Sequence, residues 1–268
     1  MENKYSAKGV AFGLLKCLGY LALLFVVQLL VVNFAAVVLT IKFPSIDEYQ
    51  LTAMIDSLTN ELNIFVGALT ILLLAVLSML RKDSLSKRAS INKFPGKFTL
   101  NLAIMGVSAS YAVTLVLGLL TMANLLPQSW VAIQNDAYSG MLSASPMLQF
   151  LSVGLMAPLV EEILFRGHIL GALKKEMHPW IAILISAVFF GVSHGTPIGI
   201  IYATALGIVM GWLTITFDSI VPSLLFHIAY NCTVAYSGGV SLGIAVISIP
   251  ILIFEIMTIK NYFRGKKE

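Results

Sequence analysis

The sequence is poor in charge. Only 11% of its 268 residues are Asp, Glu, Lys or Arg, whereas 58% are hydrophobic, and the mean hydropathy is +0.91. Soluble domains carry about 25% charged residues, so a deficit of this size excludes an ordinary soluble domain. It predicts an all-α polytopic membrane protein, because a helix satisfies its backbone hydrogen bonds internally within a bilayer.

Cysteine is scarce as well. Cys17 and Cys232 lie in separate apolar runs and no Cys-x-x-Cys pair occurs, which excludes a thiolate zinc site and a disulfide framework. No His-Glu-x-x-His sequence occurs either, so a zincin-type site is excluded. The net charge of +4 comes without a basic stretch interleaved with aromatic residues in a folded soluble segment, and no nucleic-acid partner is expected.

Long apolar runs make up most of the chain. A helix needs about 20 apolar residues to cross the hydrocarbon core of a bilayer. We predict about eight transmembrane helices, at 12–40, 62–80, 98–126, 148–173, 180–194, 197–217, 219–236 and 240–259. Because the fifth run is short, it and the sixth form either two spans or a re-entrant or tilted pair.

Basic residues are distributed unevenly between the segments that join these runs. Segment 81–97 holds six Lys or Arg residues against one acid, whereas segment 41–61 holds one base against four acids. Loops rich in Lys and Arg stay in the cytoplasm. With both termini inside, 81–97, Lys174 and Lys175, and the basic C-terminal tail all become cytoplasmic. We therefore expect a multi-pass protein of a bacterial plasma membrane, with the lipid bilayer as one partner.

Two adjacent carboxylates and an arginine lie inside the fourth run. A charge at this depth costs about 3 kcal/mol on insertion scales and indicates a specific need. Glu162 and Arg166 are four residues apart, share a helix face and are predicted to form an ion pair. Glu161 points about 100° away from Glu162, which leaves it without a cation on its own helix and makes it the candidate general base. A charge cluster with only a structural role is the alternative.

Two histidines and an asparagine lie in later runs. His194 ends the fifth run, and His227 and Asn231 share a helix face in the seventh because they are four residues apart. Together with Glu161, these side chains are sufficient to position and deprotonate a water, with Asn231 as a donor to a developing oxyanion. Glu161, His194 and His227 could also hold a divalent metal such as Zn²⁺ with an open position. His168, in contrast, is expected at the membrane interface.

The order of these motifs is similar to that of a known family. Glu-Glu-x-x-x-Arg, Phe-x-x-x-His and His-x-x-x-Asn on successive membrane helices resemble the CAAX protease and bacteriocin-processing (CPBP) family, whose eukaryotic members are the Rce1-type prenyl-protein endopeptidases. The resemblance covers about 148–236. It implies an Rce1-like core with a conical cavity, an intramembrane endopeptidase activity, and a peptide or protein substrate at the membrane.

The resemblance also implies a role for each motif residue: Glu161 activates water, Glu162 and Arg166 support it, His194 and His227 bind water or a metal, and Asn231 stabilises the oxyanion. A metal-dependent and a glutamate-dependent mechanism both stay open. The chain is accordingly divided into variable N-terminal transmembrane helices (1–145), a protease core (146–240), and a last membrane helix with a basic tail (241–268).

Two other functions compete with proteolysis. A non-proteolytic membrane protein of the same fold would act in bacteriocin immunity or in the modulation of a membrane sensor. A transporter would use Glu161 and Glu162 as a proton relay, and it predicts a matching acid pair in an apolar run of the first 145 residues, where none is present.

The depth of the site raises one difficulty. Counting residues along the fourth run places Glu161 about 20 Å below the outer face of the membrane. The same counting along the fifth run places His194 much closer to that face. The chemistry needs both side chains at one depth, so the helix boundaries or the tilts must differ from the simple expectation.

Overall fold

The computed structural model describes residues 5–80, 91, 94–142, 144–236 and 241–265, and every regular element in them is helical. The longer helices are α1 (Ala7–Lys42), α3 (Thr59–Leu80), α5 (Thr99–Met122), α10 (Pro179–Val192), α11 (Pro197–Phe217), α12 (Val221–Tyr236) and α13 (Leu242–Arg264). The peripheral elements are α2 (Glu48–Ser57), the 3-10 turn η2 (Gly96–Phe98) and α6 (Gln128–Leu142).

One further helix runs without interruption from Pro146 to Glu176 and contains two π-helical stretches. Its parts are α7 (Pro146–Gln149), the π-helical η3 (Phe150–Met156), α8 (Ala157–Glu161), the π-helical η4 (Glu162–Leu170) and α9 (Gly171–Glu176). Stretches of π-helix are rare and often occur at functional sites. Here they flank the short α-helical turn that ends at Glu161.

Six helices in the described part of the chain are long and apolar enough to cross a membrane: Ala7–Lys42, Thr59–Leu80, Gly96–Met122, Pro146–Glu176, Pro197–Phe217 and Leu242–Arg264. The all-α polytopic class is therefore confirmed. All eight predicted runs are helical, but 180–194 and 219–236 form α10 and α12, which have only 14 and 16 residues. Neither of these two covers the full hydrocarbon thickness of about 30 Å by itself.

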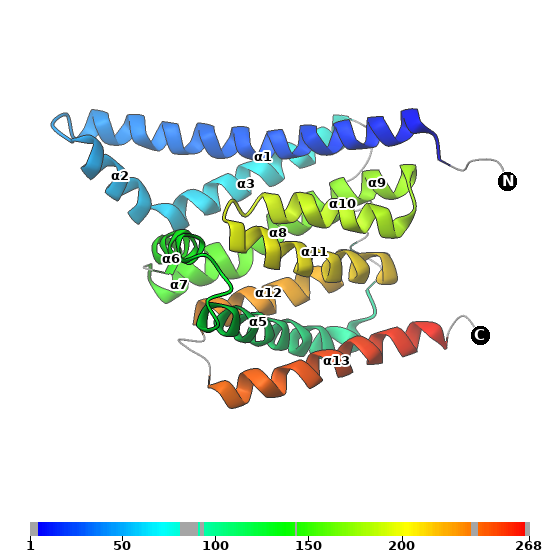
Figure 1. Cartoon of the computed structure of the whole chain (residues 1–268). Helices are drawn as coiled ribbons and strands as arrows, with labels where there is room; N and C mark the ends of the chain where they lie inside the picture. Colours follow the sequence, from blue (N-terminus) through cyan, green and yellow to red (C-terminus); the bar gives the residue numbers. More distant parts are fainter. Residues whose placement is uncertain (1–4, 81–90, 92–93, 143, 237–240, 266–268) are drawn as a thin grey trace.

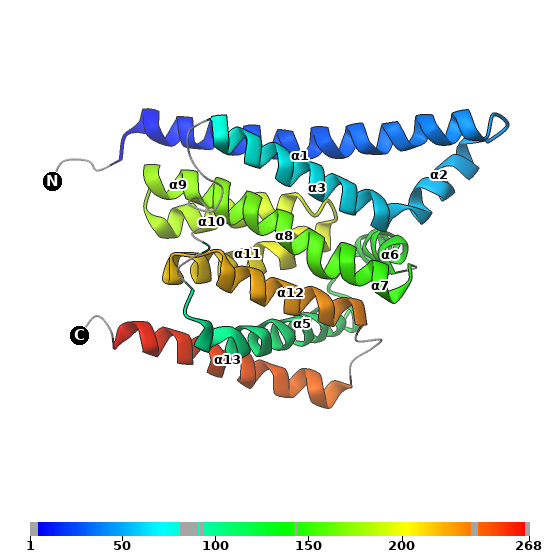
Figure 2. The same ribbon diagram turned by 180° about the vertical axis from the view of Figure 1, so that it is seen from behind.

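The helices lie roughly side by side, and the two ends of the bundle differ (Figures 1 and 2). The start of α1, the turn from α9 to α10 and the end of α13 lie at one end, whereas α2, α6 and α7 lie at the other. Lys174, Lys175 and Arg264 belong to the first of these ends. The basic side chains and both termini therefore lie at the same end of the bundle, which is the arrangement that the expected orientation requires. Most of segment 81–97 and residues 266–268 lie outside the described residues.

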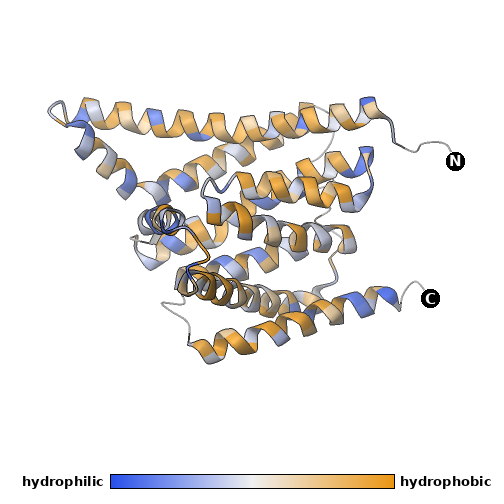
Figure 3. Cartoon of the chain, viewed as in Figure 1, coloured by the Kyte–Doolittle hydropathy of each residue, from blue (hydrophilic) through white to orange (hydrophobic). Residues whose placement is uncertain are grey.

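The centre of the bundle is η4, in which all nine residues are buried. The outer helices α1, α3 and α13 expose many large apolar side chains, and they are apolar along most of their length (Figure 3). Apolar side chains on an outer surface suit contact with lipid. The fold thus places its most buried segment, which carries the charged motif, inside a shell of lipid-facing helices.

Close packing fixes α12 within the bundle. A Cβ at Gly106 of α5 would clash with the carbonyl oxygen of Phe226 and lie 2.9 Å from Ala229 Cβ. Small residues at such positions let the backbones of membrane helices approach closely. The contact holds α12, which carries the third motif, directly against α5.

Candidate active site

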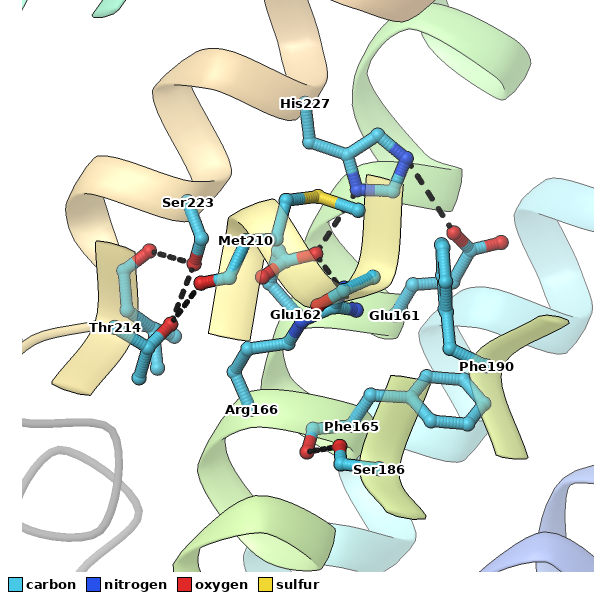
Figure 4. A network of polar contacts seen from close by, with 12 residues as sticks. Glu161, Glu162, Phe165, Arg166, Ser186, Phe190, Met210, Thr214, Ser223 and His227 are labelled. Atoms are coloured by element: carbon cyan, nitrogen blue, oxygen red, sulfur yellow. Dashed lines mark hydrogen bonds and ion pairs between the residues drawn. The ribbon is translucent and has the colours of Figure 1, made fainter. Parts of the chain in front are cut away.

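Four titratable side chains form a continuous polar chain in the core of the bundle (Figure 4). Arg166 Nη1 lies 3.1 Å from Glu162 Oε1, and the two side chains are 1% and 0% exposed. His227 Nδ1 donates to the same Glu162 oxygen at 3.0 Å, and His227 Nε2 lies 3.6 Å from Glu161 Oε2. The predicted ion pair is confirmed, and His227 connects it to Glu161.

The arginine is held by more than its carboxylate. The Arg166 guanidinium lies over the ring of Phe190, 4.3 Å from the centroid, and Nη2 reaches the carbonyl oxygen of Gly207 at 3.5 Å. Phe165 packs edge-on against Phe190 with centroids 5.2 Å apart. An arginine over an aromatic face is attracted by the ring electrons, so these contacts fix η4 against α10 and α11.

Glu162 sets the orientation of the His227 ring. Because Nδ1 donates to the carboxylate, Nε2 of the neutral imidazole is an acceptor. Nε2 and Glu161 Oε2 are then two acceptors that face each other at 3.6 Å, which is too long for a direct hydrogen bond. A water that donates one hydrogen to each of them would satisfy both acceptors.

Glu161, His194, His227 and Asn231 line one cavity of about 140 Å³, which we call the catalytic cavity. The Glu161 side chain is 23% exposed, so its carboxylate is accessible from this space. Other lining residues come from α3, η3, α6, α11 and α12: Asn63, Ser152, Tyr138, Tyr202 and Tyr230. The structure therefore brings together the four residues that the sequence assigned to water activation, with Glu162 and Arg166 buried behind them.

His194 reaches the catalytic cavity because α10 ends inside the bundle. The 14 residues of α10 correspond to a length of about 21 Å. The helix starts at the end of the bundle where α1 begins (Figure 1). A tight turn then reverses the chain into α11, with Gly195 at a φ of 73°, which glycine adopts without strain. The expected difference in depth between Glu161 and His194 is thus wrong, because the fifth run stops short of the opposite end.

Backbone carbonyls orient the remaining two side chains. His194 Nδ1 donates to Phe190 O at 2.9 Å, so Nε2 of the neutral ring is an acceptor. Asn231 Nδ2 donates to Val153 O at 2.9 Å with one of the two N–H groups of its amide. Both side chains are therefore held in place before any substrate binds.

The expected metal ligands Glu161, His194 and His227 share this cavity. Among the residues that the structure describes, however, no group of three or more His, Cys, Asp or Glu side chains is arranged to hold a metal ion. The ligand set as placed does not fit a divalent ion, and no step below depends on one. Metal binding stays a prediction.

Sequence reasoning missed the contribution of α6. Tyr138 on this helix lines the catalytic cavity, and its hydroxyl lies 2.8 Å from the hydroxyl of Tyr202. Thr196 donates to Gln134 Oε1 and ties the start of α11 to α6. Burial raises the pKa of the Tyr138 phenol, which keeps it protonated as a donor. Segment 127–147 contains no long apolar run, so no sequence signal placed it beside the site.

The expectation that His168 lies at the membrane interface is wrong, because this residue is buried at 1% exposure. Its Nδ1 lies 2.9 Å from Ile163 O, and its Nε2 lies 3.4 Å from Ser78 Oγ. The ring also packs edge-on against Tyr20 at 5.1 Å. Because η4 is buried along its whole length, His168 is a structural residue that joins η4 to α1 and α3.

Comparison with known proteins finds similarity in the segment that carries the three motifs. A family model described as type II CAAX prenyl endopeptidase, Rce1-like, matches residues 143–233. A protein named "Putative membrane peptidase YdiL" from Bacillus subtilis (strain 168) is 31% identical over 97 residues, or 36% of this chain and 39% of that protein. The chain thus spans about two-fifths of this relative's length. No solved structure matches the chain. Residues 143–233 are thus similar to the Rce1-like family, in agreement with the resemblance that the three motifs predicted.

Proposed function

From the similarity of residues 143–233 to the Rce1-like CAAX endopeptidases, we propose that the protein is an intramembrane endopeptidase. A water activated by Glu161 would hydrolyse a peptide bond of a membrane-associated protein or peptide precursor. One observation carries the proposal: the polar chain from Arg166 through Glu162 and His227 ends at Glu161, on the wall of a cavity inside an apolar bundle. A site of this kind excludes bulk water and strengthens each polar interaction within it.

The first step is the activation of water. Glu161 Oε2 and His227 Nε2, 3.6 Å apart, accept the two hydrogens of one water. Glu161 takes one proton as the water oxygen attacks the carbonyl carbon of the peptide bond. His194 lines the same cavity. Because both hydrogens of the water are already taken, its Nε2 is left to accept a hydrogen bond from the N–H of the substrate peptide.

The second step is the collapse of the tetrahedral intermediate. Asn231 donates one N–H to Val153 O, and its second N–H stabilises the oxyanion. The C–N bond then breaks, and the proton held by Glu161 passes to the leaving nitrogen. One water is consumed, and the products are a carboxylic acid and an amine.

Glu162 and Arg166 act as positioning residues in this scheme. Both side chains are almost fully buried, so neither reaches the substrate. Glu162 keeps the proton of His227 on Nδ1, which turns the Nε2 lone pair toward the water. Arg166 neutralises Glu162 and so allows a carboxylate at that depth.

The cellular setting is part of the same proposal. We infer that both termini lie in the cytoplasm, because basic residues gather at the end of the bundle where α1 begins and α13 ends (Figure 1). A bacterial plasma membrane is the setting that we propose. A fusion of a reporter to each terminus, tested for cytoplasmic activity, measures this orientation directly.

The decisive experiment compares the peptides released in membranes that contain wild-type protein or the Glu161→Gln variant. Mass spectrometry should detect products that appear only with the wild type. The matched control is Glu255→Gln, because Glu255 on α13 is another buried carboxylate in a membrane helix, bonded to Asn101 at 2.8 Å outside the cavity. Its products should equal those of the wild type.

An identical set of products from wild type and Glu161→Gln would contradict the glutamate-activated mechanism. If a bacteriocin-immunity or sensor phenotype then persisted in the variant at normal expression, a non-proteolytic role of the same fold would be favoured instead.

A further inference from the structure

A second cavity adjoins the catalytic cavity. It measures about 430 Å³ and lies between α5, α6, α11 and α12; we call it the side pocket. Four residues line both spaces: Tyr138, Tyr202, Tyr230 and Val234. The two cavities are therefore separated by a shared wall of three tyrosines and one valine.

The catalytic cavity is too small to hold a length of peptide. Its volume of about 140 Å³ equals that of roughly five water molecules, whereas ligand pockets in proteins measure about 300–1,000 Å³. It accommodates the scissile peptide group and the attacking water. The side chains that flank the scissile bond must bind elsewhere, and the side pocket is within the range of ligand-sized pockets.

The lining of the side pocket defines what it can bind. Among the described residues that line it there is no Asp, Glu, Lys, Arg or His, and its aliphatic residues include Val113, Leu117, Val131 and Ile198. An unpaired charge moved into such a space loses its hydration without compensation, whereas an apolar side chain is stabilised there in proportion to the apolar area that it buries. Amides and hydroxyls at the rim, such as Asn135, offer partners for the backbone of a bound peptide.

We propose, building on the endopeptidase function, that the side pocket is the subsite for an uncharged, apolar segment of the substrate next to the scissile bond. The segment enters between α5 and α6 and reaches the catalytic cavity along the tyrosine wall. The linked hydroxyls of Tyr138 and Tyr202 mark the boundary between the subsite and the reacting bond.

Gly118 offers a way to fill the side pocket without disturbing the fold. It lies on α5, lines the pocket and has no atom within 4 Å of the position that a Cβ would take. Gly118→Phe therefore reduces the space for substrate. Gly19→Phe is the matched control, because Gly19 is also exposed inside a long helix, has the same open surroundings and lines neither cavity.

The test uses purified protein in phosphatidylcholine vesicles and a library of synthetic decapeptides in which one position is Gly, Ala, Leu, Phe, Asp or Lys. Mass spectrometry measures the rate at which each peptide is cleaved. We expect the wild type to prefer Leu or Phe over Asp and Lys on one side of the cut. In Gly118→Phe, the ratio of Leu to Ala cleavage should fall about tenfold relative to Gly19→Phe, the scale on which a few methylenes change selectivity.

Two results would overturn the subsite and leave the proposed function intact: equal profiles for Gly118→Phe and Gly19→Phe, or wild-type cleavage that ignores the charge of the varied residue. If no peptide is cleaved in a Glu161-dependent manner, the proposed function fails and the subsite fails with it.

A binding measurement tests the subsite independently of catalysis. The Glu161→Gln variant is irradiated with a decapeptide that carries photoreactive benzoylphenylalanine at the varied position. Crosslinks to residues 113–138 of α5 and α6 support the subsite, and their loss in the Gly118→Phe background strengthens the assignment. Crosslinks confined to other helices refute it.

Discussion

Replacing Arg166 with leucine tests how much the fold depends on the buried ion pair. The change removes the guanidinium that lies 3.1 Å from Glu162 Oε1, while the Glu162 side chain stays at 0% exposure. Glu162 keeps the hydrogen bond from His227 Nδ1 at 3.0 Å but loses its charge partner. The contact between the guanidinium and the Phe190 ring at 4.3 Å is lost as well.

The expected cost follows from the burial of both partners. Breaking a buried ion pair by removing one member costs about 3–5 kcal/mol, because it leaves an uncompensated charge. A desolvated cation–π contact is worth about 2 kcal/mol, and the apolar contacts of leucine offset part of that loss. We therefore expect Arg166→Leu to lower the free energy of unfolding by about 3–5 kcal/mol.

An exposed ion pair provides the control. Lys174 Nζ lies 3.5 Å from Asp218 Oδ1, but these side chains are 36% and 57% exposed. Pairs in such surroundings are screened by water and contribute about 0–1 kcal/mol. Lys174→Leu removes a positive charge from the same long helix, near its end, so it should cost less than about 1 kcal/mol.

Unfolding of the purified proteins in mild detergent, followed by circular dichroism against added sodium dodecyl sulfate, measures these differences. The double variant Glu162→Gln/Arg166→Leu removes both charges and should recover about 1–3 kcal/mol relative to the sum of the single variants. A loss below about 1 kcal/mol for Arg166→Leu, or strict additivity in the double variant, would refute the reasoning.

Three further predictions concern packing and chemistry. His168→Ala removes the contacts that join η4 to α1 and α3, so unfolding free energy should fall by about 1–3 kcal/mol while the folded fraction keeps its specific activity. Gly106→Ala forces a Cβ against Phe226 and should lower the free energy of unfolding by about 1–3 kcal/mol. Gly118→Ala is the control, because nothing lies close to that position, and it should not lower the free energy of unfolding. Treatment with 1,10-phenanthroline should leave product formation intact under the glutamate scheme; a loss that Zn²⁺ restores would favour the metal scheme.

Local geometry made part of the site predictable. The ion pair between Glu162 and Arg166 depends on a spacing of four residues along one helix, and that spacing brings side chains together in any regular helix. The contact between His227 and Glu162 does not follow from such a local rule, because the two residues are 65 positions apart in the sequence. No local rule decides which of two adjacent glutamates a distant histidine contacts, so its orientation became clear only from the structure.

The depth of His194 shows a second limit of sequence reading. The run 180–194 is as apolar as its neighbours and therefore resembles a span in composition. Whether such a run crosses the bundle depends on the helix bounds and on its neighbours, and α10 ends after 14 residues. The same holds for α6, which brings Tyr138 to the cavity from a segment without a hydropathy signal.

The exposure of the three charged residues in the first motif separates a structural cluster from a site that activates water. Arg166 and Glu162 neutralise each other at 1% and 0% exposure, so this pair alone is sufficient to hold η4. Glu161 is 23% exposed and faces an imidazole acceptor at 3.6 Å, an arrangement that stabilises a proton donor between the two groups but adds nothing to packing. Glu161→Gln should therefore change stability by less than about 0.5 kcal/mol, yet reduce hydrolysis at least about 10²-fold. A purely structural cluster predicts the opposite pair of results.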